Sequence, residues 1–475
     1  MSAISSSRLT SVLSALSRSE WRHFKRFITS GAAGPPGKSL ELYDYLSDFH
    51  PHFKGPEMNK KALYIAVFAN EIYDDKKLRY ALTDLYRYAC SYLRFKALED
   101  HNEEGNYLLG TTLAQRQADK AYLALYQSDG NQLYLDADKS AESYFHAYRK
   151  EFVHLNHFLP RQKRSDQNPI GNISRNLDIF FVAKKLQLLC EIVNLKNIMS
   201  VEHDFLLQEK IIELVENGIF NDVPVIIIYY RILMTLINPD DETHFGTLSE
   251  LLRTHENVFK KPELRDMYQY LMNYCIKKIN QGVSHYIATL AGIYKIILAN
   301  KVIYNGAYLS QWDFKNMVVI GIRAGEQEWV QKFIGEFSNE LIPSERNNAH
   351  AYNLAYYYFS TGAYREALSL LQQVEFTDLY YQLDMRAILL KCYFEMDDQE
   401  TFFYHIAAFR IFLSRNKLVS DYQRTIYRNM MKFATRLIRV NGDKLKAGAI
   451  QKQIEEVKQI ADINWLRKKI AVMVA

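Results

Sequence analysis

Apolar side chains recur every three or four positions along most of the chain, which is the spacing of one face of an α-helix. Near the start, Ser17 and Glu20 stand three positions apart just before an apolar stretch, and this spacing is typical of a capping box at the first turn of a helix. Further helices are predicted at about 40–50, 57–68 and 74–93. The pattern therefore predicts an N-terminal helical module over residues 1–100.

Residues 101–171 have the pattern of a long helical hairpin followed by a linker. The sequence Ser-Asp-Gly-Asn at 128–131 breaks the helical spacing. The basic run Pro-Arg-Gln-Lys-Arg at 160–164 leads into a second proline, Pro169. We favour a solvated loop over a nucleic-acid contact for this run, because no aromatic residues that could stack on bases are interleaved with it.

Residues 172–441 alternate between helical stretches and short turns, without the strand–helix rhythm of a βαβ protein. The run 223–237 is almost entirely apolar and rich in β-branched residues, but Pro224 suits the first turn of a helix and the run is longer than a typical strand. We therefore predict a buried helix there. Other helices are expected at 177–195, 201–216, 248–255, 264–279, 286–299 and 314–323.

Residues 348–381 have the pattern of a helix–turn–helix unit. Small Ala355 and Ala367 would allow its two helices to approach closely, and Gly362 would supply the turn between them. Larger residues that would fill the remaining space are Leu354, Tyr358, Leu371 and Val374. The unit is predicted to bury one apolar face against a neighbour on each side.

The sequence on either side repeats this unit in register. Cys-Tyr-Phe at 392–394 repeats Tyr-Tyr-Phe at 357–359 after 35 residues, and Ala-Gly at 324–325 precedes Thr-Gly at 361–362 by 37 residues. Three successive units therefore cover about 313–415.

These units resemble the tetratricopeptide repeat (TPR), a helix–turn–helix of about 34 residues. The pattern departs from the family at Ala351 and Leu379, where Trp and Pro are favoured. The resemblance implies an all-α fold with a TPR-like α-α superhelix, or solenoid, over residues 172–441, because each repeat buries its apolar face only by stacking on its neighbours. Residues 442–475 are expected to form C-terminal capping helices, with Asp462 as the cap of the last one.

The resemblance also implies a binding surface, because the first helices of TPR units line a concave face that holds a peptide. Carried onto the matching positions, the candidate groove consists of Lys315, Arg323, Tyr352, Tyr356, Phe359, Lys391 and Phe394. Tyr352 and Tyr356 stand where the family's carboxylate clamp needs Lys and Asn, so this unit is not expected to bind a chaperone tail. An aromatic groove with basic edges suits an amphipathic helix or an acidic peptide, while the alternative is that these rings pack against an adjacent helix.

Composition and charge add few constraints. Against 54 acidic residues, 59 basic ones give a net charge of +5, which provides little general attraction for nucleic acid or a membrane surface. The four cysteines form no CxxC pair, as expected for buried thiols in a reducing compartment. The N-terminal residues lack the apolar core of a secretory signal, and the run 223–237 is too short to span a bilayer. We therefore expect a cytoplasmic protein without membrane insertion.

No phosphate-binding loop, GxSxG, HExxH or EF-hand pattern occurs in the sequence, so we expect a non-enzymatic protein without cofactor or metal. His50 and His52 lack further ligands nearby, which favours a loop over a metal pair. The polar residues His203, Asp204 and Glu209 have the pattern of a solvated helix face. The acidic run 240–242 favours a helix start over a cation site, because carboxylates stabilise the positive end of the helix dipole.

The leading functional hypothesis is a protein–protein interaction scaffold, or adaptor, that binds a segment of an unidentified protein on its concave face. One alternative is a nucleic-acid-binding helical-repeat protein that uses the basic linker and scattered Lys and Arg residues, and its affinity would fall steeply with salt. The other is a peptide-sensing regulator that relays binding to residues 1–100.

Overall fold

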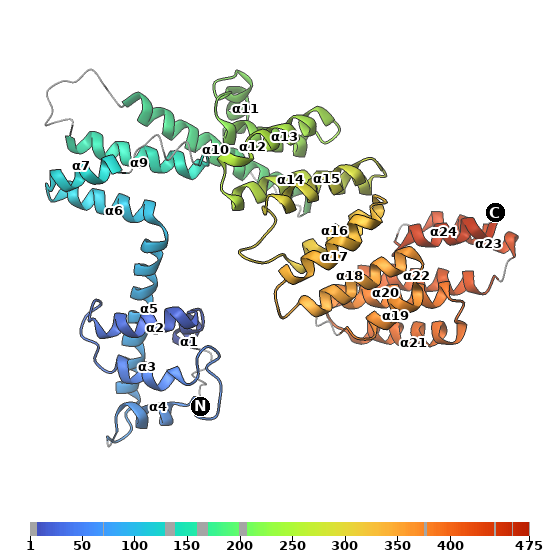
Figure 1. The fold of residues 1–475 in the computed structure, drawn as a ribbon, viewed down its shortest axis with the longest axis horizontal. Helices are drawn as coiled ribbons and strands as arrows, with labels where there is room; N and C mark the ends of the chain where they lie inside the picture. Colours follow the sequence, from blue (N-terminus) through green and yellow to red (C-terminus); the bar gives the residue numbers. More distant parts are fainter. Residues whose placement is uncertain are drawn as a thin grey trace. The chain divides into compact units, whose positions relative to one another are not determined.

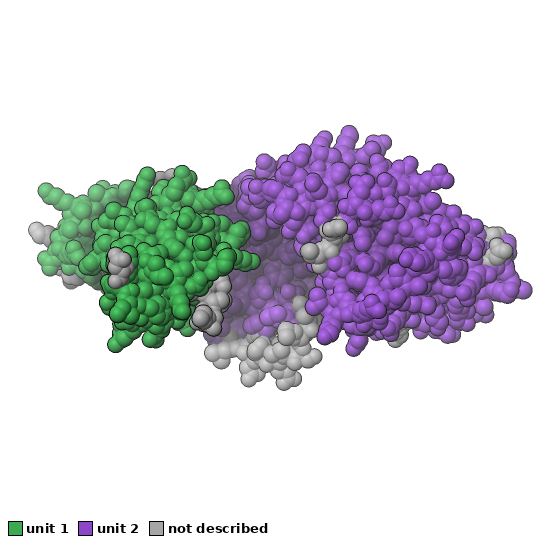
Figure 2. Space-filling model, turned by 90° about the horizontal axis from the view of Figure 1, so that it is seen from below, with its two compact units in different colours: residues 1–137, 141–181 green, residues 138–140, 182–475 purple. Residues whose placement is uncertain are grey.

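The protein is built from α-helices joined by turns and longer loops (Figure 1). The computed structural model describes residues 7–69, 71–128, 138–158, 170–198, 207–374, 378–440, 443–457 and 459–474. Within these ranges there are two isolated β-bridges and no β-strand, which confirms the predicted all-α class. The chain divides into two compact units, one formed by residues 1–137 and 141–181 and the other by residues 138–140 and 182–475 (Figure 2).

The first unit begins with five helices that share one apolar core. They are α1 (Arg8–Ser14), α2 (Arg18–Thr29), α3 (Ser39–Ser47), α4 (Lys60–Val67) and α5 (Asp75–Asp100). The predicted capping box is present, since the Ser17 hydroxyl accepts from the Glu20 amide and the Glu20 carboxylate accepts from the Ser17 amide at 2.8 Å. Trp21 lies between Tyr43 and His50, with ring centroids 4.5 and 4.6 Å away. His50 is thus part of this aromatic packing.

The second part of the first unit contains α6 (Asn102–Gln115), α7 (Asp119–Ser128), α9 (Ala141–Phe158) and the start of α10 (Ile170–Ile198). The predicted two-helix hairpin is wrong in detail, because the chain turns between α6 and α7 at Gln117, which adopts a left-handed φ of 59° without any glycine or proline nearby. Most of the predicted break at 128–131 and of the linker at 160–171 lies outside the described residues.

The second unit continues as a succession of helices. They are α11 (Gln208–Glu216), α12 (Pro224–Ile237), α13 (Glu242–Thr254), α14 (Lys261–Asn280), α15 (Tyr286–Ala299), α16 (Gln311–Arg323), α17 (Gln327–Phe337), α18 (Arg346–Thr361), α19 (Tyr364–Leu371), α20 (Leu379–Glu395), α21 (Gln399–Arg415), α22 (Asp421–Ile438), α23 (Lys444–Glu456) and α24 (Ile463–Val474). Short 3-10 turns follow α13 at Glu256–Val258 and α17 at Ser338–Glu340. The helical prediction for 223–237 is confirmed, with Pro224 in the first turn. The acidic run begins α13, where the Asp241 carboxylate accepts from the Thr243 amide. His203 and Asp204 lie outside the described residues.

Three consecutive helical hairpins are compatible with the predicted repeat spacing: α16 with α17, α18 with α19, and α20 with α21. The first helix of each hairpin is followed by a left-handed residue, at Gly325 (φ 79°), Gly362 (φ 85°) and Asp397 (φ 52°). This conformation reverses the chain at the same place in each unit, and Asp is one of the few residues with a Cβ that tolerates it. The common turn explains the 35- to 37-residue offsets in the sequence.

Small residues mark the places where helices approach most closely. Ala355 and Ala367 are fully buried in one cluster with Leu371, as predicted for the unit at 348–381. In the preceding hairpin, a Cβ added at Gly321 would lie only 2.5 Å from a methyl of Val330. Close packing of this kind fixes the angle between the two helices of a hairpin.

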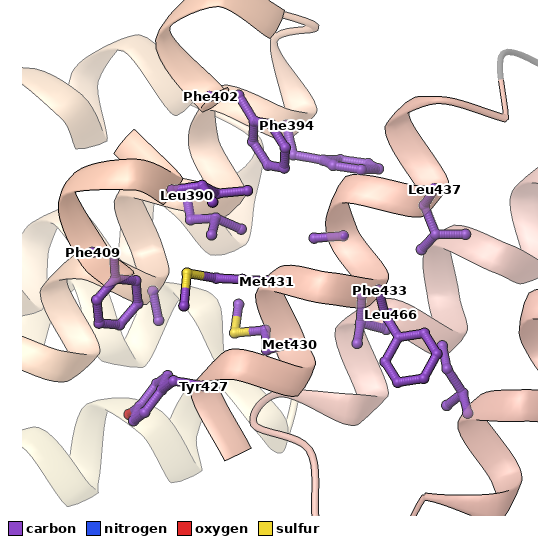
Figure 3. Close-up of a cluster of buried hydrophobic side chains, with 14 of the residues drawn as sticks. Leu390, Phe394, Phe402, Phe409, Tyr427, Met430, Met431, Phe433, Leu437 and Leu466 are labelled. Carbon is purple, nitrogen blue, oxygen red and sulfur yellow. The ribbon is translucent and has the colours of Figure 1, made fainter. Parts of the chain in front are cut away.

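The C-terminal helices α22, α23 and α24 share a continuous apolar core with α20 and α21 (Figure 3). Met430, Met431 and Phe433 of α22 point into this core, and Leu466 of α24 joins it. Asp462 directly precedes α24 as predicted, but its carboxylate is bonded to Lys391 of α20. The expected capping bond is therefore replaced by a long-range ion pair.

Candidate functional site

The seven residues of the predicted groove come from α16, α18 and α20, and most of them are not presented to solvent. Tyr352, Lys391 and Phe394 are buried, with 2%, 5% and 8% of their surface exposed. Lys315, Tyr356 and Phe359 are half-buried, and Arg323 is exposed. Lys315 lies beside the Tyr352 ring and Lys391 beside the Phe359 ring, in the interior of the helices rather than on an open aromatic surface.

The first reason for this burial is that α16 lies against α20. Lys315 forms an ion pair with Asp384, and its ammonium lies 4.8 Å from the ring centroid of Tyr381 and 5.4 Å from that of Tyr352. The Tyr381 hydroxyl donates to the Gln311 carbonyl at 2.9 Å. Asp384 also accepts from the Tyr427 hydroxyl at 3.2 Å. The Tyr352 ring is therefore enclosed by charged and aromatic side chains from neighbouring helices.

The second reason is that α20 is met in turn by the start of α24. The Lys391 ammonium donates to Asp462 at 2.8 Å, and the Trp465 indole donates to Glu395 at 2.8 Å. Lys469 forms an ion pair with the same Glu395 carboxylate. The ring of Phe394 meets that of Trp465 edge-on at 5.1 Å. We refer to the α16–α20 and α20–α24 contacts together as the contact seam.

The spacing along the chain explains why these contacts form. The bonded residues of the contact seam are 69 to 74 positions apart, which is about two repeat steps of 35 residues. The first helix of one hairpin, α16, therefore reaches the first helix of the next hairpin but one, α20, and α20 reaches the start of α24. The expectation that Tyr352, Lys391 and Phe394 line an exposed groove is corrected, because this contact covers them.

The electrostatics of the contact seam keep it in the paired state. Burial lowers the pKa of Lys391, but the charge and hydrogen bond of Asp462, together with the nearby Tyr356 and Asp384, raise it by more, so that the pKa lies above the usual lysine value. Burial raises the pKa of Tyr352 far above its usual range, and burial also raises that of Tyr356. At neutral pH, Lys391 is charged and both tyrosines are neutral. A buried ammonium of this kind depends on its carboxylate partner for stability.

A pocket with a very different lining lies in the first unit, between α6, α7 and α9. It has about 650 Å³ of empty space, counted together with its open mouth. Its walls are Glu103, Asn106, Tyr107, Gly110, Thr111, Tyr122, Leu125, Tyr126, His146, Ala147, Lys150 and Val153. Apolar and aromatic side chains dominate this lining, with a few charged groups among them, and this composition is typical of ligand-binding pockets.

The aromatic wall of the pocket is held by stacking and by hydrogen bonds. The rings of Tyr126 and His154 lie parallel at 4.1 Å, and the Tyr126 hydroxyl donates to Glu151 at 2.9 Å. The Lys150 ammonium lies 4.9 Å from the centroid of the same Tyr126 ring. Burial raises the pKa of Tyr122 to about 12, so its hydroxyl stays protonated at neutral pH.

A second cation supports the other side of the pocket. Arg149 stacks on the Tyr107 ring at 3.5 Å and donates to both oxygens of Glu104, at 2.7 and 3.0 Å. Such a forked pair fixes the position of the guanidinium, and the stacking fixes the ring. The walls of the pocket are thus held in place by interactions within the first unit.

Sequence reasoning missed this pocket, although two weak signals were present. Tyr122 and Tyr126 are four positions apart on α7, and His146, Lys150 and His154 are spaced by four on α9. Each spacing places the side chains on one helix face, but the sequence alone does not reveal that the two faces meet.

In the described part of the chain, no helix is both long and apolar enough to cross a membrane, and no group of three or more His, Cys, Asp or Glu side chains is placed to hold a metal ion. Comparison of the chain with protein-family models, with curated proteins and with solved structures found no match.

Proposed function

We propose that this protein is a TPR-like helical-repeat scaffold that binds a segment of another protein in the pocket between α6, α7 and α9. The repeat character rests on three hairpins at a step of 35 to 37 residues, each with a left-handed residue after its first helix. In this proposal the contact seam holds the array together, and the partner docks elsewhere.

The observation that carries the proposal is the aromatic lining of the pocket. Tyr107 and Tyr126 are half-buried rings, each held in place by a group stacked on it, and Tyr122 is buried beside them, so that little side-chain entropy is lost when a ligand binds. The pocket is open to solvent, so an apolar side chain of a partner segment can reach this lining. The best-fitting partner is an amphipathic helix with large apolar side chains.

Gly110 offers a clean way to test this pocket. A Cβ added at Gly110 would lie 3.7 Å from both Leu125 and Tyr122, which is ordinary van der Waals contact. Gly110→Ala should therefore be accepted and leave the pocket open, whereas Gly110→Leu places three further carbons in it. Both changes replace a helical glycine, so they share the gain in helix propensity.

The experiment is affinity capture from the native host with the parent protein and both Gly110 variants, followed by titration of the purified partner. We expect a stoichiometric protein with the parent and with Gly110→Ala, and a loss of at least tenfold in affinity with Gly110→Leu at an unchanged melting temperature. Equal affinity for all three proteins would contradict the proposed site. Failure to recover any partner would contradict the scaffold function.

A further inference from the structure

Positive charge is concentrated at one end of the sequence, a fact that the net charge of the whole chain conceals. Residues 399–475, which comprise α21 to α24, contain 15 Lys and Arg against six Asp and Glu, a net charge of +9. The remaining residues have a net charge of −4. A local excess of this size produces a positive potential that attracts polyanions.

Four of these cations form a row on α22. Arg428, Lys432, Arg436 and Arg439 are spaced by four, four and three residues, which places them on one helix face. Arg428, Lys432 and Arg439 are exposed and Arg436 is half-exposed. With a rise of 1.5 Å per residue, the row extends over about 16 Å. We call these four residues the basic row.

The acidic residues near the basic row are mostly occupied by other cations. Asp421 pairs with Arg424 at 3.7 Å and Glu455 with Arg467 at 2.6 Å. Asp443 pairs with Lys446 at 2.9 Å, and Asp462 belongs to the contact seam. Across the described residues, no carboxylate lies within ion-pair distance of the basic row. Its charge is therefore available to an external anion.

Neutral groups lie beside the charged ends of three residues of the basic row. The Arg439 guanidinium lies 5.3 Å from the ring centroid of Phe403 on α21, and the Lys432 ammonium lies 5.8 Å from that of Phe433. Arg436 donates to the Gln453 side chain of α23. These contacts restrict the charged groups without neutralising them, which lowers the entropy cost of binding.

We propose that the basic row binds the phosphate backbone of nucleic acid without regard to sequence. Along one strand of a duplex the phosphates are about 3.4 Å apart, so a 16 Å row faces about five of them, more than the roughly three carboxylates that one face of an acidic helix could place at one per turn over the same length. Three of the four residues are Arg, whose forked donors match phosphate oxygens.

An anionic membrane is a poorer fit for the same row. Helices that bind membranes bury an apolar face in the lipid, whereas the apolar face of α22 is already committed to the protein core through Met430, Met431 and Leu437 (Figure 3). The exposed face of α22 consists of the basic row, polar residues such as Asp421 and Thr425, and one large ring, that of Tyr422. It therefore offers mainly charge and very little apolar surface for insertion into lipid.

The test measures the fluorescence anisotropy of a labelled 20-base-pair DNA duplex with the full-length protein between 50 and 200 mM salt. Over this range, the affinity of a protein that makes about four phosphate contacts falls strongly as the salt concentration rises. For four contacts, the logarithm of the affinity should fall with the logarithm of salt with a slope of about −3.6. Arg428→Glu/Lys432→Glu should lose at least tenfold in affinity and at least halve the slope. The matched control is Lys261→Glu/Lys332→Glu, which changes the net charge equally at two exposed positions of α14 and α17 and should bind like the parent.

Melting curves establish that all of the proteins are folded. If Arg428→Glu/Lys432→Glu lowers the melting temperature, Arg428→Gln/Lys432→Gln is used in place of that variant, and the same loss of salt dependence is expected. An affinity that does not change with salt would overturn the proposal, as would equal losses for the row variant and its control. Tighter binding to phosphatidylserine vesicles or to polyglutamate than to DNA would assign the row to a membrane or to an acidic protein instead.

Discussion

Replacement of Asp462 by Asn removes the charge that partners the buried Lys391 ammonium and changes little else. Asn has nearly the same shape as Asp, and it also tolerates the left-handed conformation that Asp462 adopts at φ 51°. The Lys391 side chain remains buried, so the variant strands an ammonium group inside the protein. The change therefore measures how strongly α20 depends on the start of α24.

The expected loss follows from the geometry of the pair. At 2.8 Å and an effective dielectric constant of about 20, the attraction between the two charges is about 6 kcal/mol. The Asp462 side chain is 43% exposed, so solvent screens a large part of this attraction. We expect Asp462→Asn to lower the free energy of unfolding by about 2–3 kcal/mol, somewhat less than the range for a fully buried pair.

Urea unfolding followed by tryptophan fluorescence provides the assay, since three of the four tryptophans, Trp312, Trp329 and Trp465, lie in the second unit. Lys391→Met should recover part of the loss in the double variant, because it removes the stranded charge and keeps the volume. The reasoning would be refuted if Asp462→Asn had a free energy of unfolding within about 0.5 kcal/mol of the parent. It would also be refuted if the effects of Asp462→Asn and Lys391→Met simply added in the double variant.

The same comparison has a pH dependence with a defined sign. Burial lowers the pKa of Lys391 and Asp462 raises it, with a net increase above the usual value of 10.5. The stabilisation is therefore complete below about pH 10.5 and is lost as the pH rises through the folded-state pKa. The difference between the parent and Asp462→Asn should be constant from pH 7 to 9 and shrink at higher pH. A difference that grows with pH would contradict the assignment.

Three further substitutions test the packing of the hairpins. In thermal unfolding, Gly321→Ala should be less stable than Gly335→Ala by about 1–3 kcal/mol. Both variants gain helix propensity, but only at Gly321 would the added Cβ lie 2.5 Å from a neighbouring side chain. Equal stabilities would mean that α16 and α17 are further apart than in the structure. Tyr352→Ala should cost about 3–5 kcal/mol, as expected for a buried ring, whereas an exposed groove position would cost almost nothing in chemical denaturation. Ala367→Arg should lower the melting temperature, because a long charged side chain would enter a fully buried contact, and an unchanged melting temperature would mean that the repeat register is wrong.

The local features of the fold were predictable because they depend on neighbouring residues. Ser17 with Glu20, Asp241 and Gly362 mark helix ends through backbone bonds to residues at most four positions away. The 35-residue repeat was recognisable for the same reason, since each unit uses the same turn. The helix boundary at Gln117 was missed, because no glycine or proline marks that left-handed turn.

The candidate site was predictable only in part, because it depends on how the units stack. Sequence reasoning placed Tyr352, Lys391 and Phe394 on matching faces of their helices, and the structure buries all three. Whether that face is open depends on contacts between residues about 70 positions apart, such as Lys391 and Asp462. The sequence around Lys391 or Asp462 does not indicate that either residue has such a distant partner. The basic row was hidden because acidic residues elsewhere cancel it in the net charge.

Zero-length carbodiimide cross-linking of the full-length protein tests the contact seam most directly, because the reagent joins an amine to a carboxylate only where the two groups touch. Mass spectrometry of the digested product should find peptides linking Lys315 to Asp384 and Lys391 to Asp462, together with the exposed local pair Lys25–Asp44 as a positive control. Recovery of the Lys25–Asp44 link without either link of the contact seam would contradict the closed arrangement and reopen the groove as a binding surface.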